Sequence, residues 1–287
     1  MMRPLLISIA ILFLFRFDSS ALDHAGELAA KLTPDRKIIY KTVDGRELKL
    51  HVFLPEGWKA SDQRPCFHII HGGGWAGMNP SRMYPFAADF VKRHGMVGVC
   101  PEYRLYKSDK SVTVFDCVKD ARSSVRFVRS HAAELGIDPN KLIVSGASAG
   151  GHLAAATALF DEVNEEGEDT SVSCRPDAMV LYFPVIDTSK EGYGQAKIGE
   201  RWEELSPAHQ VRAGLPPTIT FHGTGDTVTP FKGAKDFHEK MIAAGNKSIL
   251  IPYEGGVHGY LMRKKAPYVE AIDESSKFFE SLKLTIP

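Results

Sequence analysis

The sequence GASAG at residues 146–150 follows a short apolar run, Lys141–Ser145, and leads into an alanine-rich segment that ends at Phe160. A strand that ends in the pattern G-x-S-x-G and turns directly into a helix places its serine on a sharp turn, where only small neighbours fit the crowded backbone. Ser148 would then lie near the positive end of a helix, which favours negative charge on its oxygen. This stretch predicts a nucleophilic serine at the end of a buried strand.

A second stretch, HGGGW at residues 71–75, follows another apolar run that begins at Cys66. Three consecutive glycines leave the backbone bare, so this loop can direct N–H groups at a developing oxyanion. The residue after the nucleophile supplies a further N–H group in such sites. We therefore expect the N–H groups of Gly73, Gly74 and Ala149 to form an oxyanion hole.

A base is needed because a serine hydroxyl alone is a weak nucleophile. Histidine suits this task, since its ordinary pKa lies near neutrality. Among the 11 histidines, we favour His258, which lies in a glycine-rich loop after the last apolar strand-like run. Catalytic residues of parallel α/β sheets gather at the carboxyl ends of strands, in such loops. His222 and His152 remain as rival candidates for the base.

A third residue must orient the imidazole and stabilise its charged form. Asp226 is the favoured acid because it lies in a turn just after the predicted strand Pro217–His222. The resulting order of serine, aspartate and histidine along the chain is that of an α/β-hydrolase and differs from the two serine-protease orders. Asp187 and Glu254 remain as alternative acids.

Strand-like and helix-like patterns alternate along most of the chain, which predicts a mostly parallel sheet with helices on both faces. Two strands near the N-terminus, Lys37–Val43 and Leu48–Leu54, are joined by the turn Asp44-Gly45 and should form an antiparallel hairpin. The later predicted strands are 66–71, 96–101, 141–145, 177–183, 217–222 and 247–253. Neither a repeat nor a linker interrupts the pattern, so residues 22–287 are expected to form a single α/β domain.

The first 21 residues are expected to be a secretory signal peptide. Arg3 supplies the positive charge, and Ser19-Ser20-Ala21 offers small residues for cleavage. The apolar run Leu5–Phe15 is shorter than the roughly 20 residues that span a bilayer. Charged residues just after this run leave an uncleaved anchor as the alternative. We expect a secreted or periplasmic protein that makes no membrane contact after signal removal.

The charges and cysteines of the chain exclude several kinds of partner. Lysine plus arginine and aspartate plus glutamate both total 35, so the formal net charge is zero and a nucleic-acid partner is not expected. The spacing of the four cysteines matches no zinc pattern, and neither a metal nor another cofactor is expected. Buried free thiols are favoured for Cys66, Cys100, Cys117 and Cys174, and a Cys100–Cys117 bridge is the least implausible alternative.

Taken together, these motifs resemble the α/β-hydrolase-fold serine esterases of the hormone-sensitive-lipase-like and carbohydrate-esterase type. Besides the HGGGW, GASAG and His258-Gly259 stretches, the resemblance includes Tyr103-Arg104-Leu105, Ser206-Pro207, Pro216-Pro217-Thr218 and residues 222–226. It extends from about Lys37 to the C-terminus. The resemblance implies an α/β-hydrolase fold and carboxylester hydrolysis through an acyl-enzyme, without a cofactor. Exported relatives of this kind include acetylxylan and feruloyl esterases.

The segment before the HGGGW loop is short, about 49 residues from 22 to 70, which leaves room for little or no cap. This favours short-chain or polysaccharide-linked acyl esters, such as acetyl or feruloyl esters, over long-chain lipids. The alternatives are an exopeptidase or an arylformamidase with the same triad, or a non-catalytic binding protein with a hydrolase fold. Trp75, Pro184 and Tyr260 are the expected walls of the substrate pocket, although Trp75 fits the core equally well.

Overall fold

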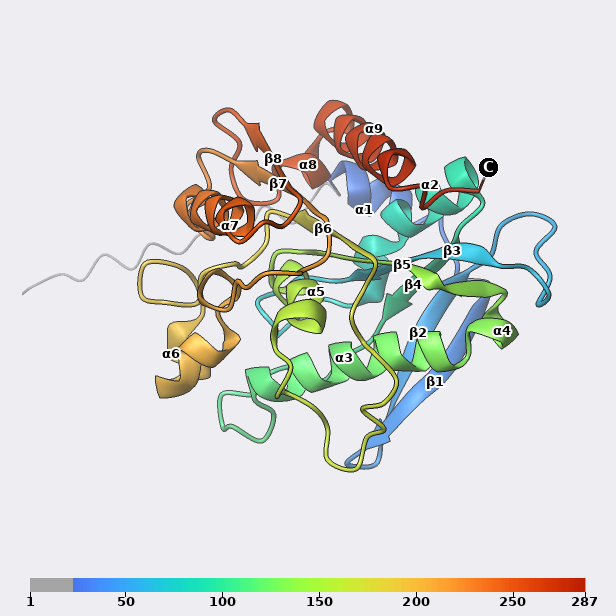
Figure 1. Ribbon diagram of the computed structural model, residues 1–287, viewed down its shortest axis with the longest axis horizontal. Helices are drawn as coiled ribbons and strands as arrows, with labels where there is room; N and C mark the ends of the chain where they lie inside the picture. Colours follow the sequence, from blue (N-terminus) through green and yellow to red (C-terminus); the bar gives the residue numbers. More distant parts are fainter. Residues whose placement is uncertain (1–22, 287) are drawn as a thin grey trace, which may run out of the picture.

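The computed structural model describes residues 23–286, which form one eight-stranded sheet with helices on both faces (Figure 1). The order of the strands across the sheet is β1-β2-β4-β3-β5-β6-β7-β8. Their bounds are β1 Arg36–Val43, β2 Arg46–Phe53, β3 Arg64–Ile70, β4 Val97–Pro101, β5 Ile137–Ala147, β6 Ala178–Tyr182, β7 Thr218–Gly223 and β8 Ser248–Tyr253. The predicted signal peptide, residues 1–21, lies outside the described residues.

The strand directions confirm the predicted sheet. β1 and β2 form the antiparallel hairpin through Asp44 and Gly45, and β2 pairs antiparallel with β4. All the remaining neighbours, from β4 to β8, are parallel. β5 begins at Ile137, four residues before the apolar run that predicted it. The residues after Ile137 are polar, but Ile137 itself pairs with Arg64 at the start of β3 and so extends the strand.

Helices fill the connections between the parallel strands, as expected from the alternation. The α-helices are α1 His24–Ala29, α2 Tyr84–His94, α3 Val114–Ser130, α4 Ala132–Leu135, α5 Ala149–Leu159, α6 Gln195–Ile198, α7 Phe231–Ala243, α8 Tyr260–Arg263 and α9 Lys265–Ser281. The described part of the chain also contains three short 3₁₀ helices, η1 Pro80–Met83, η2 Glu200–Leu205 and η3 Pro207–His209. None of the helices in residues 23–286 is long and apolar enough to cross a membrane.

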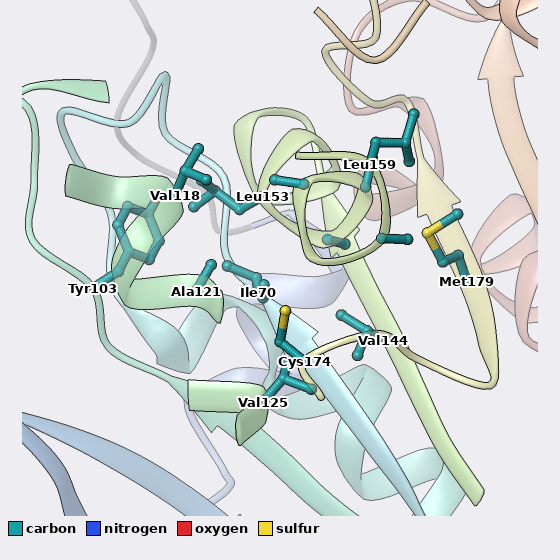
Figure 2. Close-up of a cluster of buried hydrophobic side chains, with 14 of the residues drawn as sticks. Ile70, Tyr103, Val118, Ala121, Val125, Val144, Leu153, Leu159, Cys174 and Met179 are labelled. Carbon is teal, nitrogen blue, oxygen red and sulfur yellow. The ribbon is translucent and has the colours of Figure 1, made fainter. Parts of the chain in front are cut away.

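The core lies in two layers, one on each face of the sheet. Figure 2 shows part of the first layer, in which Val118 and Val125 of α3 and Leu153 of α5 pack with Ile70 and Val144 of the sheet. The second layer lies under α2 and α9. Full burial of each such aliphatic side chain contributes about 1.5–3 kcal/mol, so both faces of the sheet stabilise the fold.

The four cysteines are buried free thiols, as predicted. Cys100 belongs to the core layer under α2 and α9, whereas Cys117 belongs to the layer under α3. The sheet separates these two layers, which explains why the alternative bridge does not form.

Three buried histidines give the fold a testable acid sensitivity. Burial lowers the pKa of His68 to about 3 and the pKa values of His71 and His152 to about 4. In the unfolded chain the same groups take up protons near pH 6.5. Since the unfolded state then binds more protons than the native state, stability must fall as the pH drops below about 6.5.

We expect each of these histidines to lower the free energy of unfolding by up to about 1.4 kcal/mol per pH unit between pH 6 and pH 4. Urea unfolding measured at several pH values from 7 to 4.5 would show this slope. The variant His68→Gln, which keeps a polar partner for Ser124, should show a shallower slope. A free energy of unfolding that is independent of pH across this range would contradict the prediction.

Candidate active site

Ser148 occupies a sharp turn between β5 and α5, as the G-x-S-x-G pattern predicted. Its backbone has φ 56° and ψ −121°, a conformation that side-chain-bearing residues rarely adopt. Two hydrogen bonds to the end of β6 and the segment after it hold this turn. The Ser148 N–H donates to the Tyr182 carbonyl at 2.9 Å, and the Val185 N–H donates to the Ser148 carbonyl at 3.0 Å. The serine side chain thus stays partly exposed between two buried alanines.

Gly146 and Gly150 of the motif have no room for a side chain, because their backbones lie against each other and against β3. A Cβ atom at Gly146 would lie 2.1 Å from the carbonyl oxygen of Gly150, and a Cβ atom at Gly150 would lie 2.1 Å from the carbonyl oxygen of Ile70. Such distances are far below van der Waals contact, so any side chain would push the turn apart. The spacing of glycines in the sequence therefore reflects a close approach of three backbone segments.

The structure brings Ser148, His258 and Asp226 together in one hydrogen-bonded row. His258 Nε2 lies 2.9 Å from Ser148 Oγ, and His258 Nδ1 lies 2.8 Å from Asp226 Oδ2. The three residues follow β5, β8 and β7, which are parallel strands that end at the same edge of the sheet. In this geometry the imidazole can take a proton from the serine on one side while the carboxylate accepts its N–H on the other.

The Asp226 carboxylate is fully buried but well supplied with hydrogen bonds. The backbone N–H groups of Val228 and Thr229 donate to its Oδ1 at 2.9 Å each, and the Thr229 hydroxyl donates to its Oδ2 at 3.0 Å. Burial by itself would raise the pKa of Asp226, but hydrogen bonds from His222 and His258 hold it well below its usual range. This carboxylate is therefore ionised throughout the neutral range.

The rival candidates lie elsewhere. His152 is fully buried, where its Nε2 contacts the Leu205 carbonyl at 2.8 Å and its Nδ1 accepts from Trp75. His222 Nε2 lies 3.5 Å from Asp226 Oδ2 and pairs with the Thr229 carbonyl at 2.7 Å. Of the rival acids, Glu254 is exposed, and Asp187 lines a second hollow of about 400 Å³ together with Pro184 and Trp202.

Hydrogen bonds to its carbonyl groups anchor the glycine loop that follows β3. The Gly72 carbonyl accepts hydrogen bonds from the Tyr103 hydroxyl at 3.1 Å and from His71 Nδ1 at 2.9 Å. Since burial keeps the pKa of His71 at about 4, its ring is neutral at pH 7 and donates through one nitrogen. The Gly73 carbonyl accepts from the N–H of Ala76 at 3.0 Å.

These contacts fix the direction of the loop's N–H groups. In a trans peptide the C=O and the next N–H point in opposite directions, so anchoring the carbonyls of residues 72 and 73 directs the N–H groups of Gly73 and Gly74 the other way. Within residues 23–286, no backbone carbonyl accepts from the N–H groups of Gly73, Gly74 or Ala149. All three groups remain available for a ligand atom beside Ser148.

A cavity of about 670 Å³ contains Ser148 and His258. Its side-chain walls are mostly apolar and are formed by Met78, Met83, Phe183, Tyr193, Val228 and Met262. Asp23 and Arg82 form an ion pair at its edge, and Arg263 lies on the same lining. The size falls within the roughly 300–1,000 Å³ of small-ligand sites.

None of the three residues expected as pocket walls, Trp75, Pro184 and Tyr260, lines this cavity. Trp75 has φ 61°, which turns its ring into the core against His152. Pro184 faces the second hollow instead. Tyr260 is stacked on Tyr253, with 4.5 Å between the ring centroids, and belongs to the core layer under α9. Several side chains that line the cavity, such as Met78, Tyr193 and Met262, lie well beyond the strand ends, and no motif marked them in the sequence.

The comparisons with known proteins agree with this architecture. A family model described as BD-FAE matches residues 50–241. The chain belongs to the BD-FAE family. It is also similar to the solved structure of Thermogutta terrifontis esterase 2 phosphoramylated by tabun, with 39% sequence identity, a TM-score of 0.83, and coverage of 88% of this chain and 96% of that chain. This likeness confirms the α/β-hydrolase fold and the resemblance to esterases that the motifs indicated.

Curated relatives are more distant and longer. A probable isoprenylcysteine alpha-carbonyl methylesterase from Arabidopsis thaliana is 28% identical over 83% of this chain and 53% of its own length. An acetylxylan esterase from Xylanibacter ruminicola is 26% identical over 78% of this chain and 46% of its own length. The chain thus spans about half the length of the curated relatives that it matches.

The glycine loop offers a matched pair of substitutions. A Cβ atom at Gly72 would lie 2.7 Å from the Ala147 carbonyl oxygen and 3.2 Å from Ser148 Cβ, whereas a Cβ atom at Gly77 would have nothing nearer than 3.9 Å. We expect Gly72→Ala to slow labelling of the serine by a fluorophosphonate about a hundredfold, since a displacement of about 1 Å can cost this much. Gly77→Ala is the control and should label like the parent. Equal labelling rates for the two variants would contradict this account of the loop.

Proposed function

We propose that this protein hydrolyses carboxylic esters through an acyl-enzyme formed on Ser148. The observation that carries the proposal is the row of hydrogen bonds from Ser148 Oγ through His258 to Asp226, next to the free N–H groups of Gly73 and Gly74. The same row would serve any acyl transfer, but Thermogutta terrifontis esterase 2 and, among the curated relatives, the methylesterase and the acetylxylan esterase are named as esterases, which favours an ester substrate.

The proposed reaction proceeds in two halves. Ser148 Oγ attacks the ester carbonyl carbon while His258 Nε2 accepts its proton, and the oxygen of the tetrahedral intermediate accepts hydrogen bonds from the backbone N–H groups. His258 then donates the proton to the departing alcohol. Water, activated by the same histidine, attacks the acyl carbon and releases the acid. Asp226 remains ionised throughout and stabilises the transient imidazolium.

For the acyl group we propose a short chain. Thermogutta terrifontis esterase 2 has been solved with propionate and with butyrate bound, and the same enzyme has been phosphonylated by sarin. The apolar cavity of about 670 Å³ suits an acyl chain of this kind or a feruloyl group. Together with the leader-like residues 1–21, this favours an exported esterase that acts on acetyl or feruloyl groups carried by polysaccharides.

Removal of the nucleophile tests the core of the proposal. We expect the parent to release a burst of nitrophenol from 4-nitrophenyl acetate and Ser148→Ala to release none. Asp226→Asn should lower kcat by about 10⁴, because the neutral amide no longer fixes the imidazole tautomer. Ser61→Ala, at an exposed serine, is the control and should match the parent. Full turnover by Ser148→Ala would refute the assignment.

A series of acyl chains tests the proposed specificity. We expect kcat/KM to rise from the acetyl to the butyryl ester, as each buried CH₂ contributes about 0.8 kcal/mol, and to rise no further for chains that extend beyond the cavity into water. Nitrophenyl esters from acetate to hexadecanoate, with methyl ferulate and acetylated xylan beside them, provide the comparison. A continuous increase up to the hexadecanoyl ester would contradict a short-acyl site.

A further inference from the structure

A lysine from a distant helix binds the third carbonyl group of the glycine loop. The carbonyl groups of residues 72 and 73 accept hydrogen bonds from groups of the core and of the loop itself. The Gly74 carbonyl accepts instead from the ammonium group of Lys197, with 2.9 Å between Nζ and the oxygen. Lys197 belongs to α6, which lies at the edge of the molecule in Figure 1. Neither half of the proposed reaction uses this lysine.

Three aromatic rings surround the ammonium group of Lys197. Its Nζ lies 5.3 Å from the ring centroid of Tyr193, 5.9 Å from that of Trp75 and 6.0 Å from that of Tyr106. The faces of aromatic rings attract cations over such distances. The same Nζ donates to the Tyr193 hydroxyl at 3.1 Å. The half-buried ammonium group is thus held in one place by two hydrogen bonds and by the rings.

No carboxylate among residues 23–286 neutralises this charge. Neither Lys197 nor the nearby Lys110 forms an ion pair in that part of the chain. Lys110 Nζ donates to the Lys197 carbonyl at 3.0 Å, so a second cation lies close to α6. Arg104, by contrast, contacts two carboxylates at less than 3 Å. A fixed cation without a counter-ion favours negative charge that develops nearby.

The ammonium group lies one layer behind the wall of the catalytic cavity. Gly74 and Tyr193 line the cavity together with Ser148, whereas Lys197 does not. A Cβ atom at Gly74 would lie 2.6 Å from the Tyr193 hydroxyl and 3.1 Å from Lys197 Nζ, so both side chains touch the loop. Lys197 can therefore act through the glycine loop and through Tyr193, rather than by contact with a substrate.

Close packing against Trp75 fixes the position of α6. A Cβ atom at Gly194, which precedes α6, would lie 2.6 Å from the Trp75 ring. Gly194 also has φ 104°, a conformation that glycine adopts without steric cost. Trp75 directly follows Gly74, so the same tryptophan joins α6 to the end of the glycine loop. The lysine and the loop therefore form one packed unit.

We propose that Lys197 is a positioning residue of the oxyanion hole. Its ammonium group holds Gly74, whose N–H is one of the expected donors, and its unneutralised charge stabilises the negative oxygen of the tetrahedral intermediate. The inference rests on the proposed acyl transfer at Ser148 and adds a role for α6. Because the negative charge on the substrate oxygen is absent from the bound ester, loss of Lys197 must lower kcat far more than it raises KM.

The variant Lys197→Met tests this role, because methionine keeps an unbranched apolar chain without the donor or the charge. We expect kcat on 4-nitrophenyl butyrate to fall about thirtyfold, less than the 10²–10³ lost with a donor of the hole itself, and KM to change less than about twofold. The affinity for a trifluoromethyl ketone, which forms an anionic adduct with the serine, should fall by the same factor as kcat/KM. The preference for butyryl over acetyl esters should remain that of the parent, since the cavity walls stay in place.

Chemical restoration of the ammonium group separates this role from damage to the fold. We expect Lys197→Cys to lose as much activity as Lys197→Met. Alkylation of the new thiol with 2-bromoethylamine rebuilds a side chain of the length and charge of lysine and should return most of the lost kcat. The parent, treated in the same way, is the control for the four native thiols, which are all buried.

Lys190→Met is the matched control substitution and should behave like the parent. Lys190 is an exposed lysine of the segment that leads to α6, and its side chain makes no ion pair with residues 23–286. Unchanged kcat in Lys197→Met would overturn the inference. A lower kcat with parental affinity for the trifluoromethyl ketone would overturn it too, as would a fully alkylated Lys197→Cys protein whose kcat stays low.

The esterase function can fail separately. If the parent does not hydrolyse 4-nitrophenyl butyrate, the rate at which a fluorophosphonate labels Ser148 still decides the role of Lys197. Labelling about thirtyfold slower in Lys197→Met than in the parent would support that role, because this reaction also places negative charge in the oxyanion hole. Equal labelling rates would overturn it.

Discussion

Three backbone segments cross at the end of β5 with no space for side chains between them. Gly146 lies against Gly150, and Gly150 in turn lies against the carbonyl groups of Ile70 and His71 at the end of β3. This contact forces the strand-to-helix turn, and the turn places Ser148 in its unusual backbone conformation. The same contact brings the glycine loop after β3 next to the serine. The positions of Ser148 and of the glycine loop's N–H groups therefore depend on one constraint.

The rest of the site depends on the parallel sheet. β5, β7 and β8 end at the same edge, so their following loops meet although Ser148 and His258 are 110 residues apart in the sequence. Buried hydrogen bonds then set the details: Tyr103 and His71 hold the glycine loop from behind, and Thr229 joins the acid to the imidazole. Tyr103 and His71, which anchor the glycine loop, are buried and neutral, whereas the Asp226 carboxylate that faces His258 is ionised.

Much of this arrangement could be predicted from the sequence because its causes are local. The hairpin, the alternating strands and the turn at Ser148 each follow from a few neighbouring residues. The choice of His258 and Asp226 followed from strand ends, and the structure places His258 against Ser148 and Asp226 against His258. Contacts that join distant segments left no comparable signal. Tyr103 and Thr229 each act through a single hydroxyl group, and the sequence does not indicate which atom that hydroxyl contacts.

The sequence by itself determined the fold class, the edge of the sheet where the site lies and the side chains that meet there, because glycine spacing and strand periodicity act over short distances. Only the tertiary structure decided the shape of the substrate space. Trp75 turned into the core through its positive φ, and Pro184 came to face the second hollow. The walls of both spaces come from five or more separate segments, and which face each segment presents depends on its packing against the others.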